Sequence, residues 1–306
     1  PHQIVTAMVE DEDGFLWVGT QGGLARWDGY RAKVYAPKAG DNHSLPDNWV
    51  SGLHLDGQKR LWIGTAGGGL ARYDRLQDHF LPVPVGLNCI SHVAVNGLAN
   101  DAAGGLWVAT EGGLDRLAPE QGASAPVLHL RHDAQDPGSL PSDSIGVVQC
   151  IGDELWVGTS KGLVHRPLSA RGNGGFLPVV LADVGVDGVS SLLQASDGRI
   201  WIGTRNHGAL VLEKGGSTAR RSKEAGQAKV GEWIYQMTEP QPGEIWLGTY
   251  GQGIIVVNAK TGQQKRINAD PLQPDSLTDD IIWSFYKGRA AARKRVRPRS
   301  VNGFIK

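Results

Sequence analysis

The chain has 306 residues, of which 40% are apolar and 20% are charged, and it contains two cysteines. No apolar run approaches the ~20 residues of a membrane-spanning helix, and two cysteines do not make a disulfide scaffold. Eight of the 31 Lys and Arg side chains follow Tyr286, so the preceding residues carry 23 bases against 31 acids. That mildly acidic body argues against nucleic acid as a partner.

The chain begins at Pro1 without a basic and then apolar leader. We therefore expect a signal peptide to be absent or already removed. Cys89 and Cys150 could form a single bridge, although two lone cysteines are more often small buried side chains.

A pentapeptide, Leu-Trp-Val/Ile-Gly-Thr, recurs along the chain with small variations. Its copies are Leu16–Thr20, Leu61–Thr65, Leu106–Thr110, Leu155–Thr159, Ile200–Thr204 and Ile245–Thr249. Successive copies start 45, 45, 49, 45 and 45 residues apart. A regular period in this range indicates a repeat architecture.

Each repeat is predicted to form four short strands. In the second repeat these are Val50–Leu55, Arg60–Thr65, Leu70–Tyr73 and His79–Pro84, separated by clusters rich in Gly and Asp. Short runs of β-branched and aromatic residues between such clusters are the signal for strands joined by hairpins. No segment has a sustained apolar period of 3.6 residues, so we expect few helices.

The first strands of the repeats share apolar positions. Their leading residues are Val5, Val50, Val95, Ile145, Val189 and Ile234, and a further apolar residue stands three positions later in each. A four-stranded unit of this size cannot bury both of its faces alone, whereas radial stacking buries a layer between each pair of units. The sequence therefore predicts an all-β protein, a β-propeller, with the repeated Trp filling the layer between blades.

We predict six four-stranded blades of about 45 residues and the first strand of a seventh, Ile282–Tyr286, in a parent ring of seven blades. The propeller is expected to span residues 1–286. Its repeats lie near 1–45, 46–90, 91–138, 139–183, 184–228 and 229–275, with a partial repeat at 276–286.

The repeat pattern fails after the seventh first strand. Register places a pentapeptide at residues 293–297, where the sequence is Arg-Lys-Arg-Val-Arg. We expect residues 287–306 to be a disordered or truncated basic tail. A basic run can also be a nucleic-acid or targeting patch, but no other feature of the chain supports that reading.

The segment Asp11–Asp28, which reads D-x-x-G-x-L-W-V-G-T-x-x-G-L-x-R-x-D, resembles the two-component regulator propeller repeat. The linkers that contain Ser-Leu-Pro resemble that family as well. The resemblance covers about residues 1–286. It implies the sensor region of a bacterial receptor, placed in the periplasm as the extracytoplasmic part of an inner-membrane protein.

The same resemblance implies partners that lie outside this chain. Members of the family commonly continue into a histidine kinase or a diguanylate cyclase, and the parent receptor could dimerise. Oligosaccharides from polymer breakdown are frequent signals in the family. Neither a cofactor nor a metal is implied.

Two patterns in the sequence have catalytic or metal-binding precedent, but their predicted settings do not suit that chemistry. Gly158–Gly162 matches G-x-S-x-G, but Ser160 lies between two predicted strands and not in the strand–turn–helix setting of a nucleophile elbow. His129, His132 and Asp133 offer metal ligands, but the spacing suits a helix and no third ligand site is evident. We therefore predict no catalytic residue and no metal site.

A binding site is expected where the repeats differ. Loops from second to third strands, and segments leading into first strands, should share one face of a propeller, where side chains can converge. Three repeats carry aromatic, amide or charged residues there, which suit a sugar. The candidate ligand-binding residues are Asn48, Trp49, Arg205, Asn206, His207, Trp233, Tyr235, Tyr250 and Gln252.

The sequence leaves three functions open. The first is a non-catalytic sensor module that binds a small or oligomeric ligand, such as an oligosaccharide, on one propeller face. The second is a platform for protein partners, in which Trp49 and Trp233 cap the propeller face or contact a partner domain. The third is a propeller lyase related to the streptogramin lyases, which is disfavoured because that family tends to end the Trp strand in Thr-Glu.

Overall fold

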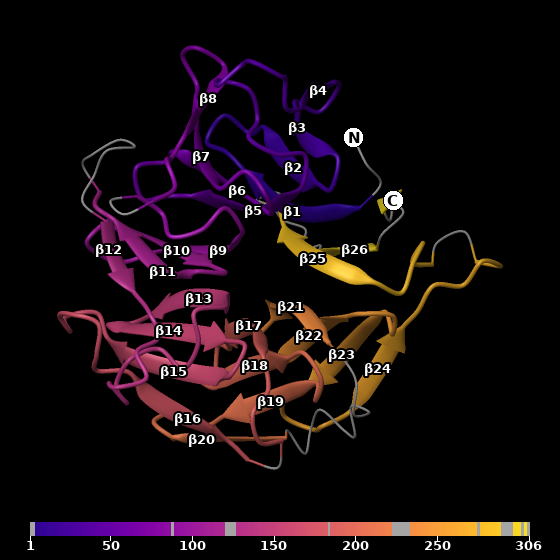
Figure 1. Ribbon diagram of the computed structural model, residues 1–306. Coiled ribbons are helices and arrows are strands. Elements are labelled where there is room, and N and C mark those ends of the chain that lie inside the picture. Colours follow the sequence, from indigo (N-terminus) through magenta and orange to yellow (C-terminus); the bar gives the residue numbers. More distant parts are fainter. Residues whose placement is uncertain are drawn as a thin grey trace. The chain divides into compact units, whose positions relative to one another are not determined.

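The computed structural model describes residues 4–86, 89–119, 127–182, 184–221, 233–273, 276–288, 296–300 and 303–304. Every regular element in these ranges is a β-strand (Figure 1), and no helix within them could cross a membrane. The chain divides into two compact units: one comprises Pro1–Thr159 with Val164–Leu177, and the other comprises Ser160–Leu163 with Pro178–Lys306.

The first unit contains three complete four-stranded antiparallel sheets, in each of which the strands lie side by side in chain order. The first sheet is β1 (Val5–Glu10), β2 (Leu16–Thr20), β3 (Gly23–Trp27) and β4 (Ala32–Tyr35). The second is β5 (Val50–Leu55), β6 (Leu61–Thr65), β7 (Leu70–Asp74) and β8 (His79–Pro82), and the third is β9 (Val95–Asn100), β10 (Leu106–Thr110), β11 (Gly113–Leu117) and β12 (Val127–Leu130).

The strands of the fourth repeat lie at the division between the units. They are β13 (Ile145–Ile151), β14 (Glu154–Thr159), β15 (Gly162–Pro167) and β16 (Leu177–Leu181). In the first unit β13 pairs antiparallel with β14. In the second unit β16 runs parallel to β20, with Val180 opposite Thr218.

The second unit contains four strands that join β16 through β20 in an eight-stranded sheet, one separate sheet of four strands and one of three. These are β17 (Val189–Gln194), β18 (Ile200–Thr204), β19 (Ala209–Leu212) and β20 (Thr218–Arg221); β21 (Ile234–Gln241), β22 (Glu244–Thr249), β23 (Ile254–Asn258) and β24 (Gln264–Ile267); and β25 (Ile282–Lys287), β26 (Val296–Ser300) and β27 (Gly303–Phe304). The sequence therefore predicted the succession of short strands, including the extra first strand, β25.

The basic tail is only partly described. Within it, β26 pairs antiparallel with β25, and β27 pairs with β26. That residues 287–306 form a disordered or truncated tail stays a prediction. Residues 289–295, 301–302 and 305–306 lie outside the described residues. Cys89 and Cys150 are both free.

The repeated Trp packs between neighbouring sheets, as predicted. Trp17 is 1% exposed and lies in a cluster with Val50 and Ile63 of the second sheet. Trp62 packs in the same way on residues of the third sheet, and Trp201 on residues of β21–β23. Each of these indoles removes a large apolar area from water, which is the main stabilising contribution of the layer.

The glycine of the pentapeptide is required by close packing. A Cβ on Gly64 would lie 2.8 Å from Cγ1 of Val95, the leading residue of the next sheet. The same contact recurs between Gly19 and Val50 at 2.6 Å. Gly203 and Gly248 meet Ile234 and Ile282 in the same way, so in these four repeats the leading residue of the next first strand occupies the space over the glycine.

The aspartates of the first hairpin do more than form turns. In the second repeat, buried Asp56 accepts hydrogen bonds from the indole Nε1 of Trp62 at 2.9 Å and from Arg60 Nε at 2.5 Å. Asp11 and Asp101 accept the indole N–H of their own repeats at 2.7 and 3.1 Å. The carboxylate therefore satisfies a donor that burial of the Trp would otherwise leave unpaired.

Candidate functional site

Each first strand carries a β-bulge at the same position. The register shifts between the leading residue and the residue two positions later in β1, β5, β9, β13, β17, β21 and β25. The residue between them has no partner on the second strand. A bulge redirects a side chain, and here it does so at one register in every repeat.

In four repeats this bulge position holds a short polar side chain that bonds to the next sheet. Asn96 Nδ2 donates to the carbonyl of Ile145 at 2.8 Å, and Ser190 Oγ donates to that of Ile234 at 2.6 Å. Thr6 and Ser51 make the equivalent bonds to the carbonyls of Val50 and Val95. The position therefore normally links one first strand to the next.

The fourth first strand has Gly146 at this position and makes no such side-chain bond. The sixth and seventh first strands differ in another way. Their bulge positions hold Tyr235 and Trp283, whose rings stack with centroids 4.3 Å apart. Neither ring can reproduce the short hydroxyl bridge. The side chain of Gln236 takes over the link between β21 and β25, because its Oε1 accepts the backbone N–H of Phe285 at 2.5 Å.

Further aromatic side chains gather around this pair. The ring of Trp233 stacks on Tyr235 at 4.6 Å, and Tyr250 lies 5.9 Å from Tyr235 and 6.2 Å from Trp233. The guanidinium carbon of Arg205 lies 5.3 Å from the centre of the Trp233 ring. We call these five residues, Arg205, Trp233, Tyr235, Tyr250 and Trp283, the aromatic cluster.

The backbone around the aromatic cluster is fixed by the repeat itself. The N–H of Tyr250 donates to the carbonyl of Trp233 at 3.0 Å, which joins the β22–β23 turn to the start of β21. Thr249, the last residue of the pentapeptide, accepts the N–H of Gln252 on its hydroxyl at 3.0 Å. The N–H of Gly251 and that of Gly253 both donate to the carbonyl of Asp280. The turn is therefore anchored at several points.

Two predicted residues turn toward a buried carboxylate. His207 Nδ1 lies 2.7 Å from Asp187 Oδ2, and Asn206 Nδ2 donates to Asp187 Oδ1 at 2.8 Å. Asp187 is 3% exposed. Burial alone would raise its pKa, but the bonds from His207 and Asn206 hold that pKa below the ordinary value. Asp187 therefore orders the β18–β19 turn that carries Arg205.

The remaining predicted residues lie apart from the ring contacts. Gln252 accepts a bond on its Oε1 from Arg266 and on its carbonyl from Asn268. Asn48 and Trp49 belong to the first unit. There the Trp49 carbonyl accepts the N–H of Ala66, as the Trp233 carbonyl accepts that of Tyr250, and the Trp49 side chain is 43% exposed.

Sequence reasoning missed Trp283 and Asp187. The repeat pattern places Trp283 in the predicted strand Ile282–Tyr286 but does not assign it to the site. The signal was available, because Trp283 stands directly after the leading residue, as Tyr235 does in the preceding repeat. Asp187 carried no comparable signal, since aspartate is common in the linkers between repeats.

The cluster contains polar atoms that lack partners. Among the described residues, Arg205 Nε, Trp233 Nε1 and Trp283 Nε1 are buried without a hydrogen bond. All three are donors. Buried donors left unpaired cost free energy, so a bound group or water that offers acceptors would be stabilised here.

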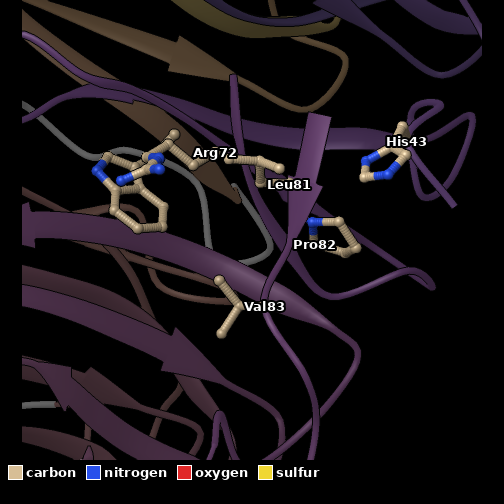
Figure 2. A pocket seen from close by; sticks show the side chains of 6 residues that line it. His43, Arg72, Leu81, Pro82 and Val83 are labelled. Atoms are coloured by element: carbon tan, nitrogen blue, oxygen red, sulfur yellow. The ribbon is translucent and has the colours of Figure 1, made fainter. Parts of the chain in front are cut away.

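A separate cavity of about 290 Å³ lies in the first unit (Figure 2). Its walls are His43, Trp62, Arg72, Leu81, Pro82 and Val83. The Trp62 N–H already donates to Asp56. The cavity thus offers apolar walls with few polar groups, whereas ligand sites need several convergent ones.

One Ser, His and Asp group in the first unit resembles a catalytic triad only in composition. Ser91 Oγ lies 3.2 Å from His129 Nδ1, and the same Nδ1 lies 2.7 Å from Asp115 Oδ1. A triad histidine uses different ring nitrogens for serine and aspartate. Ser91 instead donates directly to Asp115 at 2.5 Å, so the group is a partly buried polar link.

The residues of the other catalytic and metal-binding patterns lie in turns and backbone contacts of the repeats. Ser160 lies between strands β14 and β15, which is not the setting of a nucleophile elbow. His132 Nδ1 lies 2.7 Å from the carbonyl of Leu140. Over the described ranges, no group of three His, Cys, Asp or Glu side chains is placed to hold a metal ion.

Comparisons with known proteins agree with the repeat and the fold. The model of the family described as "Two component regulator propeller" matches residues 1–22, 44–67 and 184–206. No curated protein matches the sequence. The resemblance seen in the pentapeptide repeats is thus confirmed.

Among solved structures, the chain is similar to extracellular domains from B. thetaiotaomicron that are described as parts of hybrid two component systems. That of BT4673 is 21% identical with a TM-score of 0.79 and matches 98% of this chain and 37% of its own. That of BT3049 is 20% identical with a TM-score of 0.81 and matches 99% of this chain and 39% of its own. The chain thus spans less than two fifths of these relatives.

Virginiamycin B lyase from Staphylococcus aureus is a more distant similarity. It is 11% identical with a TM-score of 0.64, over 88% of this chain and 86% of the lyase. At these identities the likeness concerns the fold alone. Together with the four-stranded sheets, it confirms the predicted all-β propeller fold.

Proposed function

We propose that the chain is a non-catalytic sensor module that binds an oligosaccharide at the aromatic cluster. The match of three segments to the two component regulator propeller model supports the proposal. The observation that carries the proposal is the replacement of a short inter-strand bridge by Tyr235 and Trp283, which stack at 4.3 Å. The exchange places two partly exposed rings where other repeats hold a short polar side chain. Flat rings beside polar donors suit sugars, whose faces are apolar and whose rims carry hydroxyls.

The proposed setting is a receptor outside the cytoplasm. The similar structures are described as extracellular domains, and we extend that placement to this chain, with the periplasm as the compartment. A histidine kinase or diguanylate cyclase would follow in the parent receptor, which could act as a dimer and could close a ring of seven blades. In this scheme the propeller occupies residues 1–286, and binding at the cluster is the input.

The proposal is tested by binding of glycans to the intact chain. A pool of plant and bacterial oligosaccharides is screened by thermal shift and then by calorimetry. Trp233→Ala is expected to abolish the shift, because Trp233 contacts Arg205, Tyr235 and Tyr250. Trp27→Ala is a matched control, since Trp27 is 43% exposed and lies on β3 in the first unit.

The same variants separate the sensor from its alternatives. Trp49→Ala tests whether the first unit contributes to binding, as the sequence predicts for Asn48 and Trp49. If no glycan shifts the melting temperature while a receptor domain binds and Trp233→Ala abolishes that binding, the chain is a protein platform. Turnover of a glycan or cyclic peptide by the purified chain would contradict a non-catalytic module.

A further inference from the structure

Arg205 forms no ion pair with any residue that the structure describes. Its backbone N–H donates to the carbonyl of Gly188, and its side chain passes over that glycine, where a Cβ would lie 2.9 Å from Arg205 Cδ. The guanidinium then lies over Trp233. No carboxylate among the described residues pairs with it.

The carboxylate on the neighbouring loop is not available to Arg205. Asp187 accepts bonds from Asn206, His207 and the N–H of Gly188, the last at 2.7 Å. Its oxygens are thus committed to the turn. The Arg205 guanidinium stacks on an aromatic ring and has no carboxylate partner among the described residues. It can therefore bind a carboxylate or sulfate group of a ligand.

The rest of the cluster also lacks negative charge. Burial, and secondarily Tyr250, raise the pKa of Tyr235 to about 12, so its hydroxyl stays neutral at physiological pH. Trp233 and Trp283 contribute only indole donors. A second guanidinium, Arg266, contacts Gln252 on the adjacent turn. The carboxylates of Asp187 and Asp280 already accept hydrogen bonds from Asn206, His207 and Ala269. The other side chains named here offer donors and positive charge.

We infer that the saccharide taken by this site is acidic, with its ring on the aromatic cluster and its carboxylate on Arg205. The inference rests on the proposed function and specifies the class of sugar. A simple aromatic acid fits less well, because its two oxygens cannot satisfy the guanidinium together with the indole and phenol donors. A uronic acid offers a carboxylate and several hydroxyl acceptors on one ring.

The experiment compares an oligogalacturonide with its methyl ester, which has the same sugar rings and no charge. Calorimetry with the intact chain is expected to give about tenfold or tighter binding of the acid at low salt, in keeping with the strength of charge-assisted hydrogen bonds. That advantage should shrink as salt rises. Arg205→Gln should remove it, and Arg205→Lys should keep part of it.

Arg220→Gln is the matched control, because Arg220 is exposed on β20 in the same unit. It should leave the preference for the acid unchanged. Melting curves for each variant show whether it folds. Equal affinity for acid and ester, or an undiminished preference in folded Arg205→Gln, would overturn the inference while leaving the sensor proposal intact.

Failure of both galacturonides to bind would also overturn the inference. The sensor proposal is judged separately by the neutral members of the glycan pool. If these bind and lose affinity in Trp233→Ala, the cluster is a neutral sugar site. If they do not, the proposed function fails with the inference.

Discussion

The rings of Tyr235 and Trp283 stack 4.3 Å apart with their planes 27° from parallel. Both residues occupy the bulge position at which Ser190 donates to the carbonyl of the next first strand. The repeat thus fixes the position and orientation of the side chain at the bulge. With Tyr235 and Trp283 at this position, two successive first strands carry an aromatic surface in place of a hydrogen-bonded link.

Replacing Tyr235 with serine should restore the link found elsewhere. The new hydroxyl is expected to donate to the carbonyl of Ile282, as Ser190 does to that of Ile234. We expect the melting temperature to change by only a few degrees, because the lost ring packing and the gained hydrogen bond are both about 1 kcal/mol. Near-UV circular dichroism should lose the signal of the stacked rings, and glycan binding should fall. A variant that unfolds would show that the stack is structural.

Replacing Ala195 with aspartate should stabilise the fifth repeat. Ala195 stands six residues before Trp201, where Asp56 stands before Trp62, and Trp201 Nε1 is buried without a partner among the described residues. Arg199 occupies the position of Arg60. The turn also matches, since the N–H of Ala195 donates to the carbonyl of Arg199 at 2.9 Å.

The expected gain from Ala195→Asp is about 1 kcal/mol, or roughly 2–4 °C in melting temperature. Asp56→Ala is the reverse experiment. It should cost about 1–3 kcal/mol, because Trp62 Nε1 and Arg60 lose their acceptor. A neutral or destabilising effect of Ala195→Asp would mean that burial of the charge outweighs the new bonds.

A methyl group on Gly64 should be costly. Its Cβ would lie 2.8 Å from Cγ1 of Val95, which is 1% exposed. Gly64→Ala is expected to destabilise the chain by about 1–3 kcal/mol, since a packed layer must shift. Gly57→Ala is the matched control, because no atom lies within 4 Å of its added Cβ. Equal urea midpoints for the two variants would contradict the packing argument.

His54 should make stability depend on pH. Burial lowers its pKa below 6.5, against the opposing effects of Asn100 and Asp56. The unfolded chain then binds a proton more readily than the folded chain, so stability is complete above pH 6.5 and is lost as pH falls below it. Urea midpoints between pH 5 and 7.5 should fall less steeply for His54→Gln. Parallel curves for the two proteins would show that other groups dominate.

The sequence alone determined the repeat and its scaffold. The period of the pentapeptide defined the successive first, second and third strands, and the buried Trp17 and Trp62 lie between sheets as expected. This was possible because hairpin turns and alternating burial are local properties, repeated in each unit with the same residues. The glycine of the pentapeptide is part of the same scaffold, because Val95 packs on Gly64.

Only the tertiary structure decided which of the residues that differ between repeats are in contact with one another. The sequence proposed Trp233, Tyr235, Tyr250 and Arg205 as residues of one face, and Trp283 stands at the position of Tyr235 in the next repeat. Which of their rings are in contact could not be predicted. These side chains come together because the bulge at the start of β21 and β25 gives successive repeats the same orientation. The tertiary structure also decided that His207 contacts the carboxylate of Asp187. Arg205 therefore has no carboxylate partner among the described residues. Such contacts depend on the spacing between neighbouring sheets, which no local pattern in the sequence specifies.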